Sequence, residues 1–213
     1  MINIMNEKRT YQSPLRKDQK KHTRDLIIEG LIRSMTKDPV NWSVPDVASE
    51  AGVSIATVYR YFRTKEQLVQ GLGAYVGRKL GVFDLQPPHT PQEYVAAARN
   101  FYRRSAGNID ALRMFRASEL HLEERSRFMP TRLQVIRDTF AAVLPTFPEQ
   151  EREHLVHIIL MLSSSAMVLA FKDYLDLSGE EAAETVAWAI LKLAYAGGSA
   201  GEDSTPAKNE PHK

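Results

Sequence analysis

Residues 43–66 read SVPDVASEAGVSIATVYRYFRTKE. Ser43 and Ser54 each precede a short run with helical spacing, and serine is a favoured N-cap because its hydroxyl accepts a hydrogen bond from the first turn. Gly52 stands between the two runs, where the backbone must turn sharply. The stretch therefore predicts two short helices joined by a tight turn.

Two short helices joined by such a turn form a helix-turn-helix, whose second helix fits the DNA major groove. We place this second helix at residues 55–62 and expect Val58 and Phe62, four positions apart, to face the core. The other positions carry apolar, hydroxyl, aromatic and cationic side chains that suit DNA, namely Ile55, Ala56, Thr57, Tyr59 and Arg60. The pattern predicts a DNA-binding protein.

Each exposed residue of this helix has its own binding capacity. Ile55 and Ala56 offer only apolar contacts, such as with a thymine methyl group, whereas Thr57 can bond a phosphate or a base. Arg60 can bind guanine bidentately or bind a phosphate, and the sequence leaves both open.

The first helix of the pair begins near Ser43, whose hydroxyl is placed to bind a phosphate together with the NH groups at the helix start. Either Ser43 or Val44 is its cap, because Pro45 restricts the backbone of Val44.

Composition narrows the class of protein. The chain has 213 residues, of which 43% are hydrophobic and 25% charged, and it has no cysteine, so disulfides, thiolate metal sites and cysteine nucleophiles are excluded. No apolar run approaches the roughly 20 residues that span a bilayer, and the N-terminus lacks the apolar core of a secretory signal. We expect a cytoplasmic protein that contacts no membrane.

Basic residues concentrate in the first part of the chain. Residues 1–82 carry 14 Lys and Arg against 8 Asp and Glu, whereas residues 83–213 carry 14 against 18. This asymmetry fits an N-terminal domain that alone meets phosphates, with chance fluctuation as the alternative. A basic arm would enter the minor groove, bind phosphates nonspecifically or serve solubility alone; its cations are Lys8, Arg9, Arg16, Lys17, Lys20, Lys21 and Arg24.

Apolar residues at helical intervals predict an all-α protein. Besides the helix-turn-helix, we expect helices at 17–36, after Thr64, and at 91–106, 108–120, 122–144, 149–173 and 179–196. The expected domains are a flexible basic arm (1–15), a three-helix helix-turn-helix DNA-binding domain with a connecting helix (16–82), a helical effector-binding and dimerisation domain (83–196) and a disordered tail (197–213).

The stretch DVASEAGVSIATVYRYFRTKEQL, residues 46–68, resembles the N-terminal signature of the TetR-type transcriptional regulators, which ends in Y-x-(Y/H)-F followed by K-(E/D)-x-L. The likeness covers roughly residues 20–75; in the rest of the chain only helical character, length and position agree. The resemblance implies a homodimer that binds a palindromic operator, usually as a repressor released by a small molecule.

The resemblance also implies roles for single residues. Tyr59 should lie against DNA, Tyr61 should give its hydroxyl to a phosphate, and Lys65 with the start of the following helix should form a phosphate clamp. Many relatives carry a polar or basic residue where Pro45 stands, and since proline has no NH donor we expect that contact to be absent here.

An effector pocket would lie among the later helices. Its candidate lining residues, each of which could equally be plain core, are Phe101, Tyr102, Met114, Phe115, Phe128, Met129, Phe140, Met161, Ser165, Met167 and Phe171. Because no cluster of buried charge is evident, we expect an apolar or amphipathic effector. Ser163, Ser164 and Ser165 interrupt an apolar run, where small hydroxyl residues allow close packing or contacts to a ligand.

The last two long helices have surplus apolar surface that suits a dimer interface, and Trp188, Leu191 and Tyr195 belong to that interface or to the core below it. His121 among acidic neighbours and the pair His154 and His157 lack a full metal-ligand set, so we expect no metal site. We also expect no cofactor and no catalytic residues. The alternative function is an architectural protein that binds DNA without sequence preference or effector.

Overall fold

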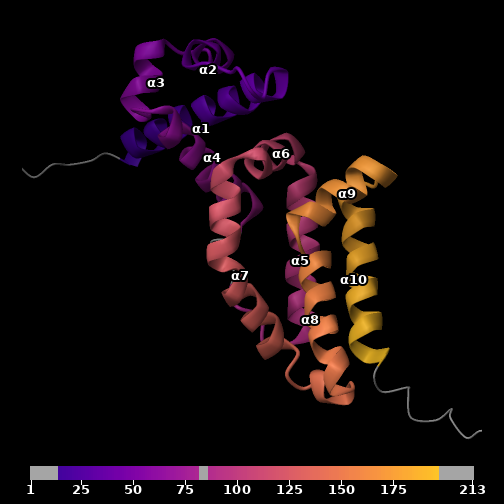
Figure 1. The fold of residues 1–213 in the computed structure, drawn as a ribbon. Helices are drawn as coiled ribbons and strands as arrows, with labels where there is room; N and C mark the ends of the chain where they lie inside the picture. Colours follow the sequence, from indigo (N-terminus) through magenta and orange to yellow (C-terminus); the bar gives the residue numbers. More distant parts are fainter. Residues whose placement is uncertain (1–13, 82–85, 197–213) are drawn as a thin grey trace, which may run out of the picture. The chain divides into compact units, whose positions relative to one another are not determined.

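The computed structural model describes residues 14–81 and 86–196, and within them it contains helices and no strand (Figure 1). The all-α prediction is confirmed. The helices are α1 (Pro14–Lys37), α2 (Val44–Ala51), α3 (Ile55–Tyr61), α4 (Lys65–Leu80), α5 (Pro91–Ala106), α6 (Ile109–Ala117), α7 (Glu119–Thr139), the 3-10 turn η1 (Leu144–Thr146), α8 (Glu149–Leu162), α9 (Ser165–Leu175) and α10 (Gly179–Tyr195).

Contacts divide the chain into two compact units, and the boundary falls after Tyr75, inside α4. The predicted domain 16–82 contains the whole connecting helix, whereas the contacts assign the residues of α4 from Val76 onward to the second unit. The predicted arm (1–13) and tail (197–213) lie outside the described residues.

The first unit, which we call the head, is built around the packing of α1 against α2. Gly30 makes this possible: a Cβ atom there would lie 2.7 Å from the carbonyl oxygen of Val47 and 2.8 Å from the backbone nitrogen of Ala51. The two helices therefore meet backbone to backbone. The buried apolar side chains of the head include Ile27, Ile28, Leu31, Val47, Val58, Phe62, Leu68 and Leu72.

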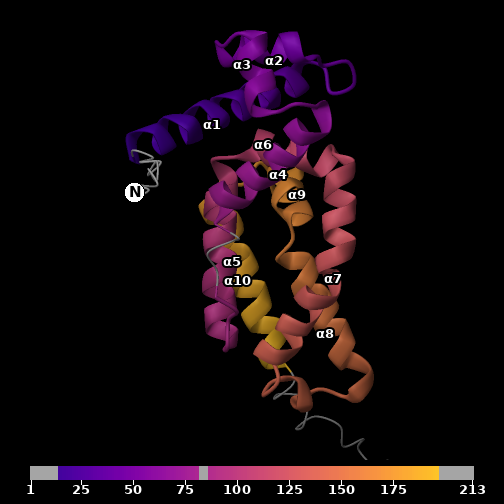
Figure 2. The same ribbon diagram turned by 90° about the vertical axis from the view of Figure 1, so that its left-hand side faces the viewer.

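The second unit, the body, has α5 and α10 side by side along their lengths (Figures 1 and 2). Their buried faces carry small side chains, including Ala98 on α5 and Ala183 and Ala187 on α10. Two bidentate ion pairs link the exposed edges of the same helices: Arg99 with Glu184, and Arg103 with Glu180.

The expected single helix over 149–173 is wrong, because the chain breaks at Ser163 and Ser164 into α8 and α9, which are bent by 64°. Serine hydroxyls compete for backbone hydrogen bonds, which weakens a helix interior. Here Ser163 Oγ donates to the carbonyl of Ile159 at 2.6 Å, and Ser164 Oγ caps α9 by accepting from the NH of Met167.

Two tyrosine side chains of α5 donate hydrogen bonds to the break between α8 and α9. The Tyr102 hydroxyl donates to the carbonyl of Leu162 at 2.6 Å, and the Tyr94 hydroxyl donates to Ser163 Oγ at 2.9 Å. Burial raises the pKa of both tyrosines, so they remain neutral donors.

Other helix ends also differ from expectation. The first helix begins at Pro14, and the helix predicted at 122–144 runs from Glu119 to Thr139, where the chain turns into η1. No single described helix is long and apolar enough to cross a membrane, although the bent pair α8 and α9 together has the required length and composition.

Candidate nucleic-acid interface

The start of α2 is fixed by a reciprocal cap. Ser43 is the N-cap, and its side chain accepts from the NH of Asp46 while its own NH donates to the Asp46 carboxylate at 2.9 Å. The Ser43 hydroxyl also bonds that carboxylate. The phosphate contact expected of Ser43 would therefore have to compete with Asp46, and Pro45 in the first turn offers no NH.

The turn between α2 and α3 depends on Gly52. Its backbone has φ 65° and ψ 32°, the left-handed conformation that favours glycine, and its NH donates to the carbonyls of Ala48 and Ser49. Ser54 then caps α3, because its side chain accepts from the NH of Thr57 at 3.1 Å. These local bonds orient α3 relative to α2.

The burial of α3 matches the predicted two-residue anchor. Val58 is fully buried and Phe62 is 2% exposed, so the helix is held from one side. Its opposite face presents Ile55, Ala56, Tyr59 and Arg60, all exposed. Positions i, i+1, i+4 and i+5 of a helix share one face, so these four side chains form a continuous strip.

Thr57 differs from those four residues. It is half-buried, and its hydroxyl lies 2.9 Å from Ser54 Oγ. Its role is therefore divided between the cap of α3 and any contact to DNA.

Arg60 carries a charge with no carboxylate partner among the described residues. Its guanidinium lies 5.5 Å from the ring centre of Tyr61, a cation–π contact that steadies the side chain without neutralising it. The charge stays available for a phosphate or for a guanine edge.

Lys65 has a second function that the sequence did not predict. Its Nζ donates to the carbonyl of Trp42 at 3.0 Å and lies 4.6 Å above the indole ring of the same residue. The ammonium group thereby ties the start of α4 to the loop before α2. Two of its three hydrogens remain for a phosphate.

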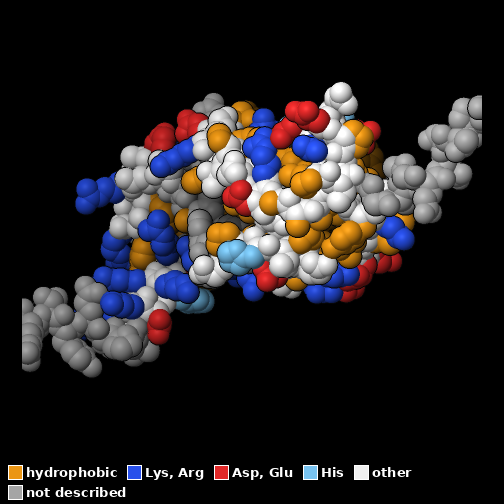
Figure 3. Space-filling view, turned by 90° about the horizontal axis from the view of Figure 1, so that it is seen from below, with side chains coloured by type: hydrophobic (Ala, Val, Ile, Leu, Met, Phe, Trp, Pro, Cys, Tyr) orange, Lys and Arg blue, Asp and Glu red, His pale blue; other side chains and the backbone are white. Residues whose placement is uncertain are grey.

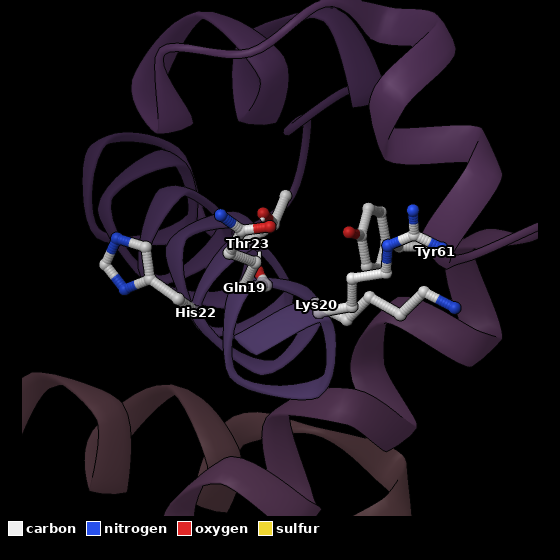
Figure 4. A pocket seen from close by; sticks show the side chains of 6 residues that line it. Gln19, Lys20, His22, Thr23 and Tyr61 are labelled. Carbon is white, nitrogen blue, oxygen red and sulfur yellow. Dashed lines mark hydrogen bonds between the residues drawn. The ribbon is translucent and has the colours of Figure 1, made fainter. Parts of the chain in front are cut away.

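Tyr61 borders a shallow hollow of about 380 Å³ between α1 and α3 (Figure 4). The hollow is lined otherwise by side chains of the first turns of α1: Arg16, Gln19, Lys20, His22 and Thr23. The Tyr61 hydroxyl points toward α1 and has no hydrogen-bond partner among the described residues. Hydroxyl and cationic groups gathered in one hollow suit a phosphate of the DNA backbone.

The basic residues of α1 are helical from Arg16 onward, so they belong to a rigid element and not to a flexible arm. Lys17, Lys20 and Lys21 are exposed, and Arg24 stacks 4.4 Å above the ring of Phe62. Figure 3 shows blue Lys and Arg side chains gathered at the left of the face that is drawn. Lys8 and Arg9, the remaining cations of the predicted arm, lie outside the described residues.

The candidate effector residues of the body fall into three groups that differ in how deeply their side chains are buried. Tyr102, Met114 and Phe140 are core residues, each at most 7% exposed, whereas Phe128 and Met161 lie at the surface. The half-buried members are Phe101, Phe115, Met129, Ser165, Met167 and Phe171. The buried three therefore belong to the core, which fits the alternative that these candidates are plain core.

The helix α8 presents both histidines of the suspected metal pair to solvent. His154 and His157 are exposed, and His157 lies 3.8 Å from Glu153, which also pairs with Arg137. Among the described side chains no group of three metal-ligating residues comes together. The side chain of His121 is not among those described.

One family model, described as bacterial regulatory proteins of the tetR family, matches residues 27–72. No protein of curated function matches the chain. Among solved structures, a TetR-like transcriptional regulator from Rhodococcus sp. RHA1 is similar, with 14% sequence identity and a TM-score of 0.58 over 84% of this chain and 96% of that one. At that identity the likeness shows a shared fold, and the family match falls within the head, on the part of the chain that carries the candidate interface described above.

Proposed function

Because this chain is a member of the TetR family of DNA-binding transcriptional regulators, we propose that it represses transcription by binding a palindromic operator as a homodimer until a small-molecule effector releases it. The observation that carries the proposal is the strip of exposed residues on α3. Ile55 is 44% exposed and Tyr59 is 48% exposed, which leaves apolar surface open on a helix that is otherwise anchored.

On DNA the strip would read the major groove. Ile55 and Ala56 would meet thymine methyl groups, Tyr59 would lie against the backbone or a base, and Arg60 would bind guanine or a phosphate. The cations of α1 and Lys65 would bind phosphates on either side and fix the register without reading sequence. This division separates residues that choose the operator from residues that supply affinity.

The dimer is supported by apolar side chains exposed on α8 and α10. Ile158 and Met161 are three positions apart on α8, while Trp188 and Tyr195 are seven apart on α10, so each pair shares one helix face. Trp188 is 63% exposed. An apolar surface of this kind marks a protein interface, and the same patch on two copies gives a two-fold dimer.

Release follows from two-headed binding. A two-fold dimer must place its recognition helices about 34 Å apart, or a multiple of it, to meet successive major grooves. An effector that changes this separation lowers operator affinity while each head stays folded. The half-buried side chains Phe101, Met129, Met167 and Phe171 favour an effector with an apolar part, and the protein would act in the cytoplasm, where it meets DNA.

The test is binding of the purified protein to the DNA upstream of its own gene and to random DNA of equal length, over a salt series. A specific repressor prefers the upstream fragment and protects a palindrome in a footprint. In that case Tyr59→Ala should weaken specific binding, and the exposed body residue Arg127→Ala should serve as the matched control. Equal and steeply salt-dependent affinity for both DNAs would instead favour the architectural protein.

A further inference from the structure

Four arginines of the body are neutralised by carboxylates. Arg99, Arg103, Arg113 and Arg137 each place two nitrogens against a carboxylate, with closest distances of 2.8, 2.6, 2.7 and 2.8 Å. Bidentate pairs of this kind are the strongest hydrogen-bonded ion pairs in proteins. Two half-buried arginines of the described body residues have no such partner: Arg152, which donates to the Phe147 carbonyl at 3.2 Å, and Arg116.

Arg116, near the end of α6, is such a residue. It is half-buried, and its Nη1 donates to the hydroxyl of Ser165 at 3.0 Å, but no carboxylate among the described residues pairs with it. Burial lowers the pKa of Arg116, and the positive charge of Arg125 lowers it further. The guanidinium remains ionised, because arginine does not lose its proton in proteins.

The surroundings of Arg116 increase the positive potential. Ser165 is the first residue of α9, an 11-residue helix whose positive end therefore lies at this position. Arg125, on the neighbouring helix α7, adds a second cation to the same region. A half-buried positive charge in a positive environment is unfavourable unless a counter-ion neutralises it.

Apolar residues lie close in sequence to Arg116 and to its partner Ser165. Phe115 precedes Arg116 on α6, and Leu169 lies one helical turn beyond Ser165 on α9, and both are half-buried. Leu162, on the other side of the α8–α9 break, is half-buried as well. This part of the body therefore combines a positive charge that no described carboxylate neutralises with apolar side chains that are incompletely buried.

We infer that Arg116 and Ser165 bind the acidic group of an amphipathic organic anion, whose apolar part lies against Phe115 and Leu169. This rests on the proposed function and narrows its effector class: the effector carries a carboxylate, a sulfonate or a similar anion. Such a ligand would bridge α6 and α9, and would do so at the break that Tyr94 and Tyr102 hold from α5. Arg116 thus selects the ligand by charge.

Two dyes test this directly. Anilinonaphthalene sulfonate is an amphipathic anion, and phenylnaphthylamine is the same molecule without the sulfonate; both fluoresce on binding to apolar sites. We expect the wild-type protein to bind the anionic dye at least about tenfold more tightly, which corresponds to one charge-assisted contact. Arg116→Gln should remove that preference and leave the affinity for the neutral dye unchanged.

Two variants serve as controls. Arg116→Lys keeps the charge and should retain most of the preference, while Arg127→Gln removes an exposed arginine of α7 and should change nothing. If Arg116→Gln does not fold, Arg125→Gln replaces it and should reduce the preference in part. Equal binding of both dyes by the wild type, no binding of the anionic dye, or a preference that survives Arg116→Gln would each overturn the inference. Because the assay contains no DNA, its outcome is independent of whether the protein is a repressor.

Discussion

Gly30 offers the sharpest test of how the head is built. In Gly30→Ala the new methyl group would lie 2.7 Å from the Val47 carbonyl oxygen and 2.8 Å from both the backbone nitrogen and the Cβ of Ala51. Overpacking costs about 1–3 kcal/mol, and backbone neighbours that cannot rotate away place this case near 3. Alanine recovers about 1 kcal/mol of helix propensity over glycine. The head should therefore lose about 2 kcal/mol of unfolding free energy.

The two tryptophans allow each unit to be followed separately. Trp42 is in the head and Trp188 is in the body, and the chain has no others. In a Trp188→Phe background, the fluorescence of Trp42 during urea unfolding reports the head alone. A loss of about 2 kcal/mol should appear as a lower midpoint with an unchanged slope, since the surface exposed on unfolding is the same.

The control is Gly107→Ala in the body, read by Trp188. A Cβ atom there would have no neighbour closer than the Arg104 carbonyl oxygen at 3.9 Å, and φ is −79°, so we expect a change below about 0.5 kcal/mol. If Gly30→Ala instead raised the stability of the head by about 1 kcal/mol, only helix propensity would be acting. The backbone contact between α1 and α2 would then be refuted.

Three further predictions concern function and packing. Arg60→Ala should weaken operator binding roughly tenfold. If the dependence of log affinity on log salt concentration is unchanged and the preference at one base pair is relaxed, Arg60 binds guanine; if that slope falls by about one, Arg60 binds a phosphate. No loss of affinity would contradict both assignments. Trp188→Glu should give a monomer by analytical ultracentrifugation with its helical circular dichroism retained, and a persistent dimer would place the interface elsewhere. Ser105→Ala should stabilise the body by about 1 kcal/mol in thermal unfolding, because Ser105 Oγ is buried without a hydrogen-bond partner, whereas a loss of stability would indicate that the hydroxyl is satisfied.

The head could be predicted closely from sequence because its signals are local. Ser54 caps the helix that begins at the next residue, Gly52 makes the turn through its own φ, and Val58 and Phe62 are four positions apart. The family resemblance added the expected roles of Tyr59 and Tyr61, and these roles stay predictions until they are measured on DNA.

What sequence reasoning missed depends on residues far apart in the chain. The break between α8 and α9 is held by Tyr94 and Tyr102, whose hydroxyls donate to Ser163 Oγ and to the Leu162 carbonyl across 69 and 60 positions of sequence. The run of Ser163, Ser164 and Ser165 in the sequence indicated an unusual point in the helix, but the break there also depends on hydrogen bonds from tertiary partners. The contact of Lys65 with Trp42 was hidden for the same reason, because the two residues are 23 positions apart.

The anchoring of α3 also has an evolutionary consequence. The helix is held by Val58, Phe62 and the caps at either end, while Ile55, Ala56, Tyr59 and Arg60 contribute little to the packing of the head. Substitutions at those four positions are therefore nearly free of stability cost, so lineages can exchange them without passing through unfolded intermediates. A gene duplicate of this protein could acquire a new operator by a few surface changes, and an engineer could do the same by randomising four codons.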